Sequence, residues 1–73
     1  MMEEQWLRCV GERLEDLRSG SYLSEGELGA ILGIPGNRIR FYEIGYNQMS
    51  ITVLGKYCNY FDVTADYLLF GKM

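Results

Sequence analysis

Apolar residues recur along the chain at the spacing of helices, and no segment alternates apolar and polar residues as a strand would. In residues 3–18 the apolar positions step by three, four and three, so they share one face of a helix. These positions are Leu7, Val10, Leu14 and Leu17. Polar and glycine residues at 19–21 then interrupt the pattern. A first helix is therefore predicted over residues 3–18.

Two shorter helices are predicted directly after the first. Ser24, with Glu27 three residues later, has the form of a capping box, so the second helix begins after Ser24. Gly33 ends this helix in the left-handed conformation. Its apolar face is Leu28, Ile31 and Leu32. Pro35 suits the first position of a third helix over residues 35–43. The inward-facing residues of that helix are Ile39 and Tyr42.

Two further helices complete the pattern. Ser50 suits the N-cap of a helix that runs to about Phe61, and Thr64 caps a last short helix that ends before Gly71. Their inward-facing residues are Val53, Leu54, Tyr57, Phe61, Leu68 and Leu69. Helices this short depend on mutual packing, and a chain of 73 residues supplies one core. The pattern predicts an all-α fold of five helices, with residues 1–73 as a single domain.

Composition narrows the classes of function. No apolar run reaches the roughly 18 residues that a membrane span requires. The first five residues include Glu3 and Glu4 and no base, which is not typical of a signal peptide, so a cytoplasmic location is expected. Histidine, the usual general base, is missing, and no phosphate-binding glycine loop is present. We therefore expect neither an enzyme nor a cofactor.

The cysteine positions give no sign of a metal site. Cys9 and Cys58 lie far apart and lack the local ligand spacing of a zinc site. In a chain without a secretory signal, they are expected to be free thiols buried as small apolar side chains. The glycines stand singly, and we expect them at helix ends and turns.

Residues 24–44 have the form of a helix-turn-helix unit. Two helices joined by a short turn that contains glycine are the geometry of a DNA-binding bihelical motif. Gly29 is small enough to allow a close crossing of the two helices, and Gly33 allows the turn. The shared core of the unit is Leu28, Leu32, Ile34, Ile39 and Tyr42.

Five segments of the chain carry a family resemblance. They are residues 17–18 (Leu-Arg), 23–29 (Leu-Ser-Glu-Gly-Glu-Leu-Gly), 32–34 (Leu-Gly-Ile), 39–43 (Ile-Arg-Phe-Tyr-Glu) and 63–71 (Val-Thr-Ala-Asp-Tyr-Leu-Leu-Phe-Gly). Over residues 10–71 the chain resembles the Cro/CI-type phage repressor family, also called the xenobiotic-response-element family of bacterial regulators. The resemblance implies a compact lambda-repressor-like five-helix domain. It also implies that the second helix of the unit enters the major groove of double-stranded DNA and that a homodimer binds a palindromic operator.

By this resemblance, the exposed N-terminal face of the third helix meets base edges. The candidate residues are Gly36, Asn37, Arg38, Arg40 and Phe41. Asn37 can pair bidentately with adenine and Arg40 with guanine, while Phe41 can pack on a thymine methyl group. Gly36 offers no side chain for readout and only allows the backbone to come closer.

Contacts to phosphate, by the same resemblance, come from helix N-termini and nearby polar side chains. The candidates are Ser24, Asn47, Ser50 and Lys56, with Gln48 beside them. Both serines equally suit a purely structural role as helix caps. Arg18 and Glu43 stand where the family often holds an internal ion pair, so we expect them to stabilise the fold.

Some residues depart from the family, and most departures remove polarity from the expected DNA face. They are Glu25 in place of glutamine, Ile44 and Tyr46 in place of polar or basic residues, Met49 in place of proline, and the apolar Ile31. The net charge is −3. Residues 1–18 hold five acids and three bases, and residues 19–73 hold five acids and four bases. Negative charge is therefore concentrated in the first helix, away from the expected DNA face.

Two functions are compatible with these features. The first is a sequence-specific DNA-binding transcriptional regulator, a small repressor that acts as a homodimer. The second is a protein-interaction module on the same fold, with weak or no DNA binding and an exposed apolar patch for a protein partner. The patch would consist of Ile31, Phe41, Ile44, Tyr46 and Met49. Candidates for the dimer surface are Tyr60, Tyr67, Phe70 and Met73.

Overall fold

Helices account for most of residues 2–72, which are the part of the chain that the computed structural model describes. They are α1 (Met2–Gly20), α2 (Glu25–Leu32), α3 (Gly36–Glu43), α4 (Ile51–Phe61) and α5 (Ala65–Phe70). These residues contain no strand, so the prediction of a five-helix all-α domain is confirmed. Within the same range, no helix combines the length and the apolarity that crossing a membrane requires.

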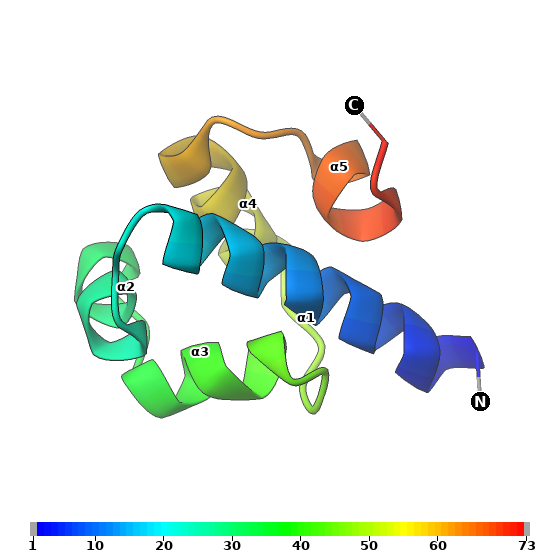
Figure 1. Cartoon of the computed structure of the whole chain (residues 1–73), viewed down its shortest axis with the longest axis horizontal. Coiled ribbons are helices and arrows are strands. Elements are labelled where there is room, and N and C mark those ends of the chain that lie inside the picture. The colour runs from blue at the N-terminus through cyan, green and yellow to red at the C-terminus, as the bar shows by residue number, and fades with distance from the viewer. Residues whose placement is uncertain (1, 73) are drawn as a thin grey trace.

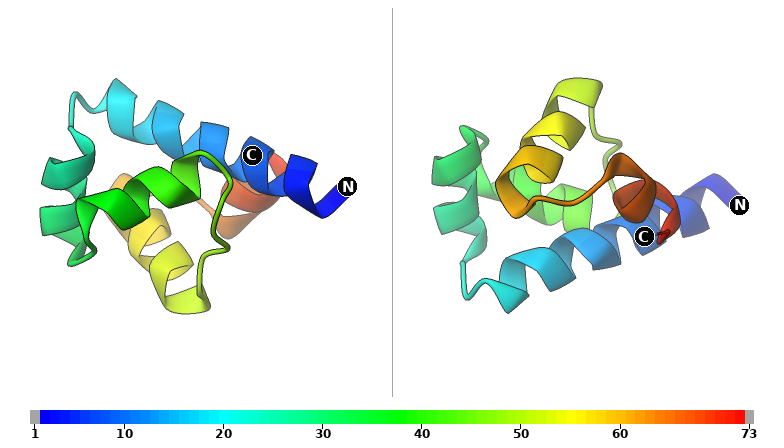
Figure 2. Two further views of the ribbon diagram at one scale, coloured as in Figure 1. Left: turned by 90° about the horizontal axis from the view of Figure 1, so that it is seen from below. Right: turned by 90° about the horizontal axis from the view of Figure 1, so that it is seen from above.

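The long helix α1 runs diagonally across the molecule, and the other helices are arranged around it (Figure 1). In this view α3 lies below α1, α4 lies behind it, and α5 lies above its N-terminal half. The short α2 stands at one end of the molecule and packs against α3, while α1 packs against both α3 and α5. The lower side of the molecule is therefore formed mainly by α3, which Figure 2 shows in front of the other helices when the molecule is seen from below.

The core takes side chains from every helix. Its buried residues are Val10, Leu14, Leu28, Leu32, Ile34, Ile39, Tyr42, Tyr57 and Leu68. Each of these positions is predicted to face inward by the apolar pattern. Ile31 differs, because it is 46% exposed although the pattern places it on the apolar face of α2. Leu28 and Leu32 already cover the core, which leaves Ile31 at the edge, over a shallow groove shared with Tyr60 of α4.

Side-chain caps begin three of the helices where the sequence predicts them. Ser24 and Glu27 each accept a hydrogen bond from the other's backbone amide, which completes the capping box of α2. Ser50 and Thr64 each accept from the amide three residues on, and so cap α4 and α5. The prediction that Pro35 is the first helical residue is wrong by one position. Its ψ of 140° lies outside the helical region, so it is the N-cap and α3 begins at Gly36.

The glycines have a second role besides ending helices. Gly33, with φ of 72°, ends α2 in the left-handed conformation as predicted. Gly11, however, lies buried in the middle of α1, contrary to the expectation that glycines occupy ends and turns. A Cβ atom on Gly11 would overlap the carbonyl oxygen of Glu43, the last residue of α3. The close approach of α1 and α3 therefore requires glycine at this position.

The cysteines lie outside the buried core. Both are free thiols, as expected, with Cys9 exposed on α1 and Cys58 half-buried on α4. The expectation that both are buried is wrong for Cys9, because its neighbour Val10 takes the inward position on α1.

A paired guanidinium and carboxylate join α1 to the end of α3. Arg18 Nε donates to Glu43 Oε2 at 2.7 Å, and Arg18 Nη2 donates to Glu43 Oε1 at 3.0 Å. A third donor, Nη1, reaches the carbonyl of Leu23 at 2.9 Å. The Glu43 side chain is only 4% exposed. Burial raises the pKa of Glu43, and the bonds from Arg18 oppose that rise without cancelling it. The expected structural ion pair is therefore present.

Replacing Arg18 by alanine would leave a buried carboxylate without its cation, and we expect a loss of about 3–5 kcal/mol in the free energy of unfolding near pH 7. The pKa of Glu43 should then rise further. A carboxyl group whose pKa is raised by folding stabilises the fold below its unfolded pKa, and this contribution is lost as the pH rises through the folded pKa. The penalty of Arg18→Ala should thus be smallest in acid, near the pKa of an ordinary glutamate, and should grow toward neutral pH.

Urea unfolding at acidic and neutral pH checks this prediction, and Arg18→Lys serves as a second variant. Lysine keeps the charge but lacks the planar fork, so we expect an intermediate loss that is easier to measure in a small domain. Equal unfolding midpoints for the parent and Arg18→Ala at neutral pH would show that the pair does not stabilise the fold.

Candidate nucleic-acid interface

The position of α3 relative to α2 is set by close contacts between backbones. A Cβ atom on Gly29 of α2 would overlap the carbonyl oxygen of Ile34 in the turn. Nearer the helix starts, a Cβ on Gly36 would lie 3.2 Å from the Cα of Gly26, so the N-terminal turns of α2 and α3 touch. The N-terminus of α2 therefore lies next to that of α3, and both reach one end of the lower side of the molecule (Figure 2). This matches the predicted close crossing at Gly29.

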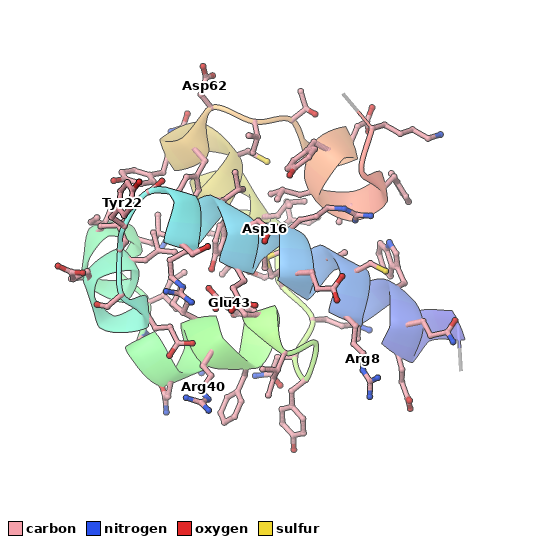
Figure 3. All side chains as sticks on the ribbon, viewed as in Figure 1. Arg8, Asp16, Tyr22, Arg40, Glu43 and Asp62 are labelled. Atoms are coloured by element: carbon pink, nitrogen blue, oxygen red, sulfur yellow. The ribbon has the colours of Figure 1, made fainter. Side chains whose placement is uncertain are left out.

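Four of the five base-reading candidates are exposed together on α3. Asn37, Arg38 and Arg40 are exposed along the first turns of the helix, and Phe41 is 37% exposed. Figure 3 shows the Arg40 side chain projecting from the lower side of the molecule. Gly36 differs from the other four, because it is half-buried against α2. Its role in this structure is to allow the two helices to meet.

The apolar patch proposed from the sequence is divided among three places. Phe41 and Tyr46 lie together with ring centroids 5.3 Å apart, and the exposed Ile44 follows the last residue of α3 between them in sequence. Ile31 lines the shallow groove between α2 and α4. Met49 instead packs against the core and lines a small cavity of about 120 Å³ between α1, α4 and α5. A continuous patch of all five residues is therefore not formed.

The phosphate candidates are already engaged within the protein, to different extents. The Ser24 and Ser50 hydroxyl groups cap their helices. Asn47 is half-buried at the mouth of the small cavity, and the Gln48 amide donates to the Glu3 carboxylate at 3.0 Å. Lys56 is exposed beside the α2–α4 groove. The structure thus separates Lys56, on the groove, from the cations of α3.

Two charged residues near α3, Glu25 and Arg8, lie in surroundings that the sequence did not predict. Glu25 is half-buried, and its carboxylate lies near enough to Arg18 to raise the pKa of that guanidinium, after the larger effect of Glu43. The same carboxylate also contributes to the raised pKa of Glu43. Arg8 of α1 projects from the same side of the molecule as Arg40 (Figure 3).

Arg8 was missed because the sequence argument placed the whole of α1 away from the expected DNA face. A Cβ on Gly45, which has φ of 77°, would lie 2.9 Å from the Arg8 amide nitrogen, so α1 passes directly beside the end of α3. Glu4 and Glu12, one helical turn to either side of Arg8, offset part of its charge. Gly45, directly after the third helix, was the one sign in the sequence that another backbone segment passes close by. The sequence does not show that this segment is α1.

The residues predicted for a dimer surface differ in their exposure. Tyr60 and Phe70 are exposed, whereas Tyr67 is half-buried. Met73 lies outside the described residues. Sequence reasoning missed Trp6, which stacks on Phe70 with ring centroids 6.2 Å apart and donates to the Leu69 carbonyl at 2.6 Å.

Comparison of the sequence with protein-family models and with curated proteins gives no match. Within residues 2–72, no group of three or more histidine, cysteine or acidic side chains is arranged to hold a metal ion. Function is therefore inferred from the geometry and charge of the α2–α3 unit.

Alanine at Gly29 should weaken the unit, because its methyl group would occupy the position of the Ile34 carbonyl. We expect the free energy of unfolding to fall by about 1–3 kcal/mol, the usual cost of overpacking. Gly26→Ala is a matched control in the same helix, since the nearest atom to its added Cβ is Ser24 Oγ at 3.9 Å. The control should be neutral or stabilising by up to about 1 kcal/mol, because alanine favours helix more than glycine does. Thermal unfolding followed by circular dichroism measures both. Equal effects of the two substitutions would contradict the crowding at Gly29.

Proposed function

We propose that the protein is a sequence-specific DNA-binding transcriptional regulator, a small repressor of the Cro/CI type that binds as a homodimer. The observation that carries this proposal is the outward side of α3, where Asn37, Arg38 and Arg40 are exposed on a helix fixed at both ends. A preorganised polar helix on the surface is suited to the major groove, which admits an α-helix.

In this proposal each polar side chain of α3 has a distinct partner. The Asn37 amide pairs with N6 and N7 of adenine, and the Arg40 guanidinium pairs with O6 and N7 of guanine. Arg38 lies beside them and binds the phosphate backbone. These contacts assign base reading to Asn37 and Arg40 and positioning to Arg38.

The N-terminus of α2 provides a further phosphate contact. The amide of Glu27 is bonded to the Ser24 hydroxyl, and the amide of Leu28 is bonded to the Ser24 carbonyl. The first two amides of the helix, those of Glu25 and Gly26, remain to face a phosphate, which the positive end of the helix dipole favours. The Glu25 carboxylate opposes this contact, because it carries a negative charge at the same end of the helix.

A specific observation also favours the second function, a protein-interaction module. Phe41, Ile44 and Tyr46 expose apolar surface at and just beyond the C-terminal end of α3, where a DNA-binding surface would ordinarily carry polar side chains. If a protein covers this surface, the cations of α3 form the rim of the interface. The two functions differ in whether the purified chain binds a bare duplex.

Fluorescence anisotropy with a random duplex pool, titrated from about 25 to 200 mM salt, tests the proposed function. This proposal gives each protomer one cationic phosphate contact, that of Arg38, so the slope of log affinity against log salt should be shallow, roughly −2 for a dimer. A duplex selected from the pool should then lose about five- to hundredfold in affinity with Asn37→Ala or Arg40→Ala, since each bidentate contact contributes about 1–3 kcal/mol.

Lys72→Ala is the control for the charge change, because Lys72 follows α5 on the upper side of the molecule. It should leave both the affinity and the salt slope nearly unchanged. Absence of binding to the pool at the lowest salt would refute the DNA-binding function. Loss of self-association in the double variant Arg40→Ala, Phe41→Ala, together with that absence, would support the protein-interaction module.

A further inference from the structure

The outward side of α3 changes from polar to apolar along its length. Asn37, Arg38 and Arg40 lie within the first five residues of the helix, Phe41 follows them, and Ile44 and Tyr46 come just beyond its C-terminal end. Phe41 is 37% exposed and Tyr46 is 74% exposed. A partner that covers this aromatic surface would gain about 25 cal/mol of binding free energy for each Å² of apolar area removed from water.

Phe41 and Tyr46, here called the aromatic pair, are held in place by the backbone. The Tyr46 amide donates to the Phe41 carbonyl at 2.9 Å, and the Asn47 amide donates to the same oxygen at 3.3 Å. Gly45 between them is left-handed and lies against α1, where a side chain would collide with Arg8. The backbone therefore places the two residues side by side, with ring centroids 5.3 Å apart.

The charges around the aromatic pair indicate which kind of partner would fit. Arg38 and Arg40 precede Phe41 on α3, and Arg8, whose charge Glu4 and Glu12 partly offset, projects from the same side of the molecule as Arg40 (Figure 3). A suitable partner must present apolar groups within a negatively charged frame. The major groove of thymine-containing DNA has this chemistry, because the thymine C5-methyl group is the apolar group on the floor of the groove and phosphates line both edges.

We propose that the aromatic pair reads thymine methyl groups, so that the preferred half-site carries thymine beside the bases read by Asn37 and Arg40. This inference rests on the proposed DNA-binding function. Phe41 is four residues beyond Asn37, which is about 6 Å along a helix of 1.5 Å rise for each residue. At 3.4 Å for each base along a strand, the thymine that Phe41 covers lies within about two base pairs of the adenine that Asn37 reads.

Replacing thymidine by deoxyuridine tests this directly, because it removes the methyl group and keeps base pairing. The probe is a duplex selected from a random pool and prepared in both forms. The parent protein should bind the deoxyuridine duplex about fourfold more weakly for each methyl group that it covers, which corresponds to ~0.8 kcal/mol for each buried carbon. Phe41→Ala and Tyr46→Ala should bind the thymidine duplex more weakly than the parent. They should also discriminate less between the two duplexes.

Tyr22→Asn is the matched control, because it removes an exposed aromatic ring that lies away from Arg40 in Figure 3. Asparagine tolerates the left-handed backbone at this position, where φ is 60°. This variant should keep the discrimination of the parent. Circular dichroism of every variant verifies that the fold is retained.

The other possible results of this experiment would each overturn the inference, and they can be told apart. Equal binding of the parent to both duplexes overturns methyl reading and leaves the DNA-binding function intact. Discrimination that persists undiminished in Phe41→Ala and Tyr46→Ala assigns methyl reading to other residues. Absence of binding to either duplex at low salt overturns both this inference and the proposed function. A change in oligomeric state in these variants, without a change in discrimination, would identify the aromatic pair as a protein interface.

Discussion

The place of α3 depends on a single residue at its end, Glu43. Its carboxylate is bonded by Arg18 through two nitrogens, and its carbonyl oxygen lies against Gly11, where no side chain fits. The two contacts support each other, because the paired groups are buried only where the backbones of α1 and α3 come this close. Without Gly11 the helices would separate, and water would reach the ion pair and weaken it.

A buried ion pair contributes more to the position of a helix than to overall stability. Removing two charges from water costs free energy that their attraction recovers only with good geometry. Burial indeed outweighs Arg18 in setting the pKa of Glu43, which is raised. Tyr57 packs in the same region, and its pKa is also raised, mainly by burial and then by the nearby Glu43 carboxylate. What the pair adds is direction, because a guanidinium group donates two parallel hydrogen bonds to a carboxylate in one orientation and so fixes how α3 lies on α1.

This arrangement holds α3 at both ends. At its N-terminus α3 touches α2 through Gly36 and Gly26, and at its C-terminus it is held by Arg18 and Gly11. The backbone that carries the exposed side chains is therefore held in place by contacts within the protein. If the chain binds DNA as proposed, this preorganised backbone would compensate in part for a net charge of −3 with few cations near α3, because less conformational entropy would be lost on binding.

The order and limits of the helices, and the identity of the core, were determined by the sequence itself. Capping residues such as Ser24 and Thr64 act on their own helix, and inward positions such as Leu14 and Ile39 follow from a helical period, so both are local properties. The pair of Arg18 and Glu43 was also expected, but only through a family resemblance, since residues 25 positions apart show no pairing in a pattern.

Only the tertiary structure decided what surrounds α3. Gly11 and Gly45 look like ordinary helix breakers in the sequence, and their meaning depends on which backbone passes beside them. The same limit explains why Arg8 was not assigned to the side of α3, and why Ile31 and Met49 were wrongly grouped with Phe41. A periodic pattern gives the direction of a side chain relative to its own helix. The neighbours that it meets depend on how the helices cross, and that is set by contacts between residues far apart in the chain.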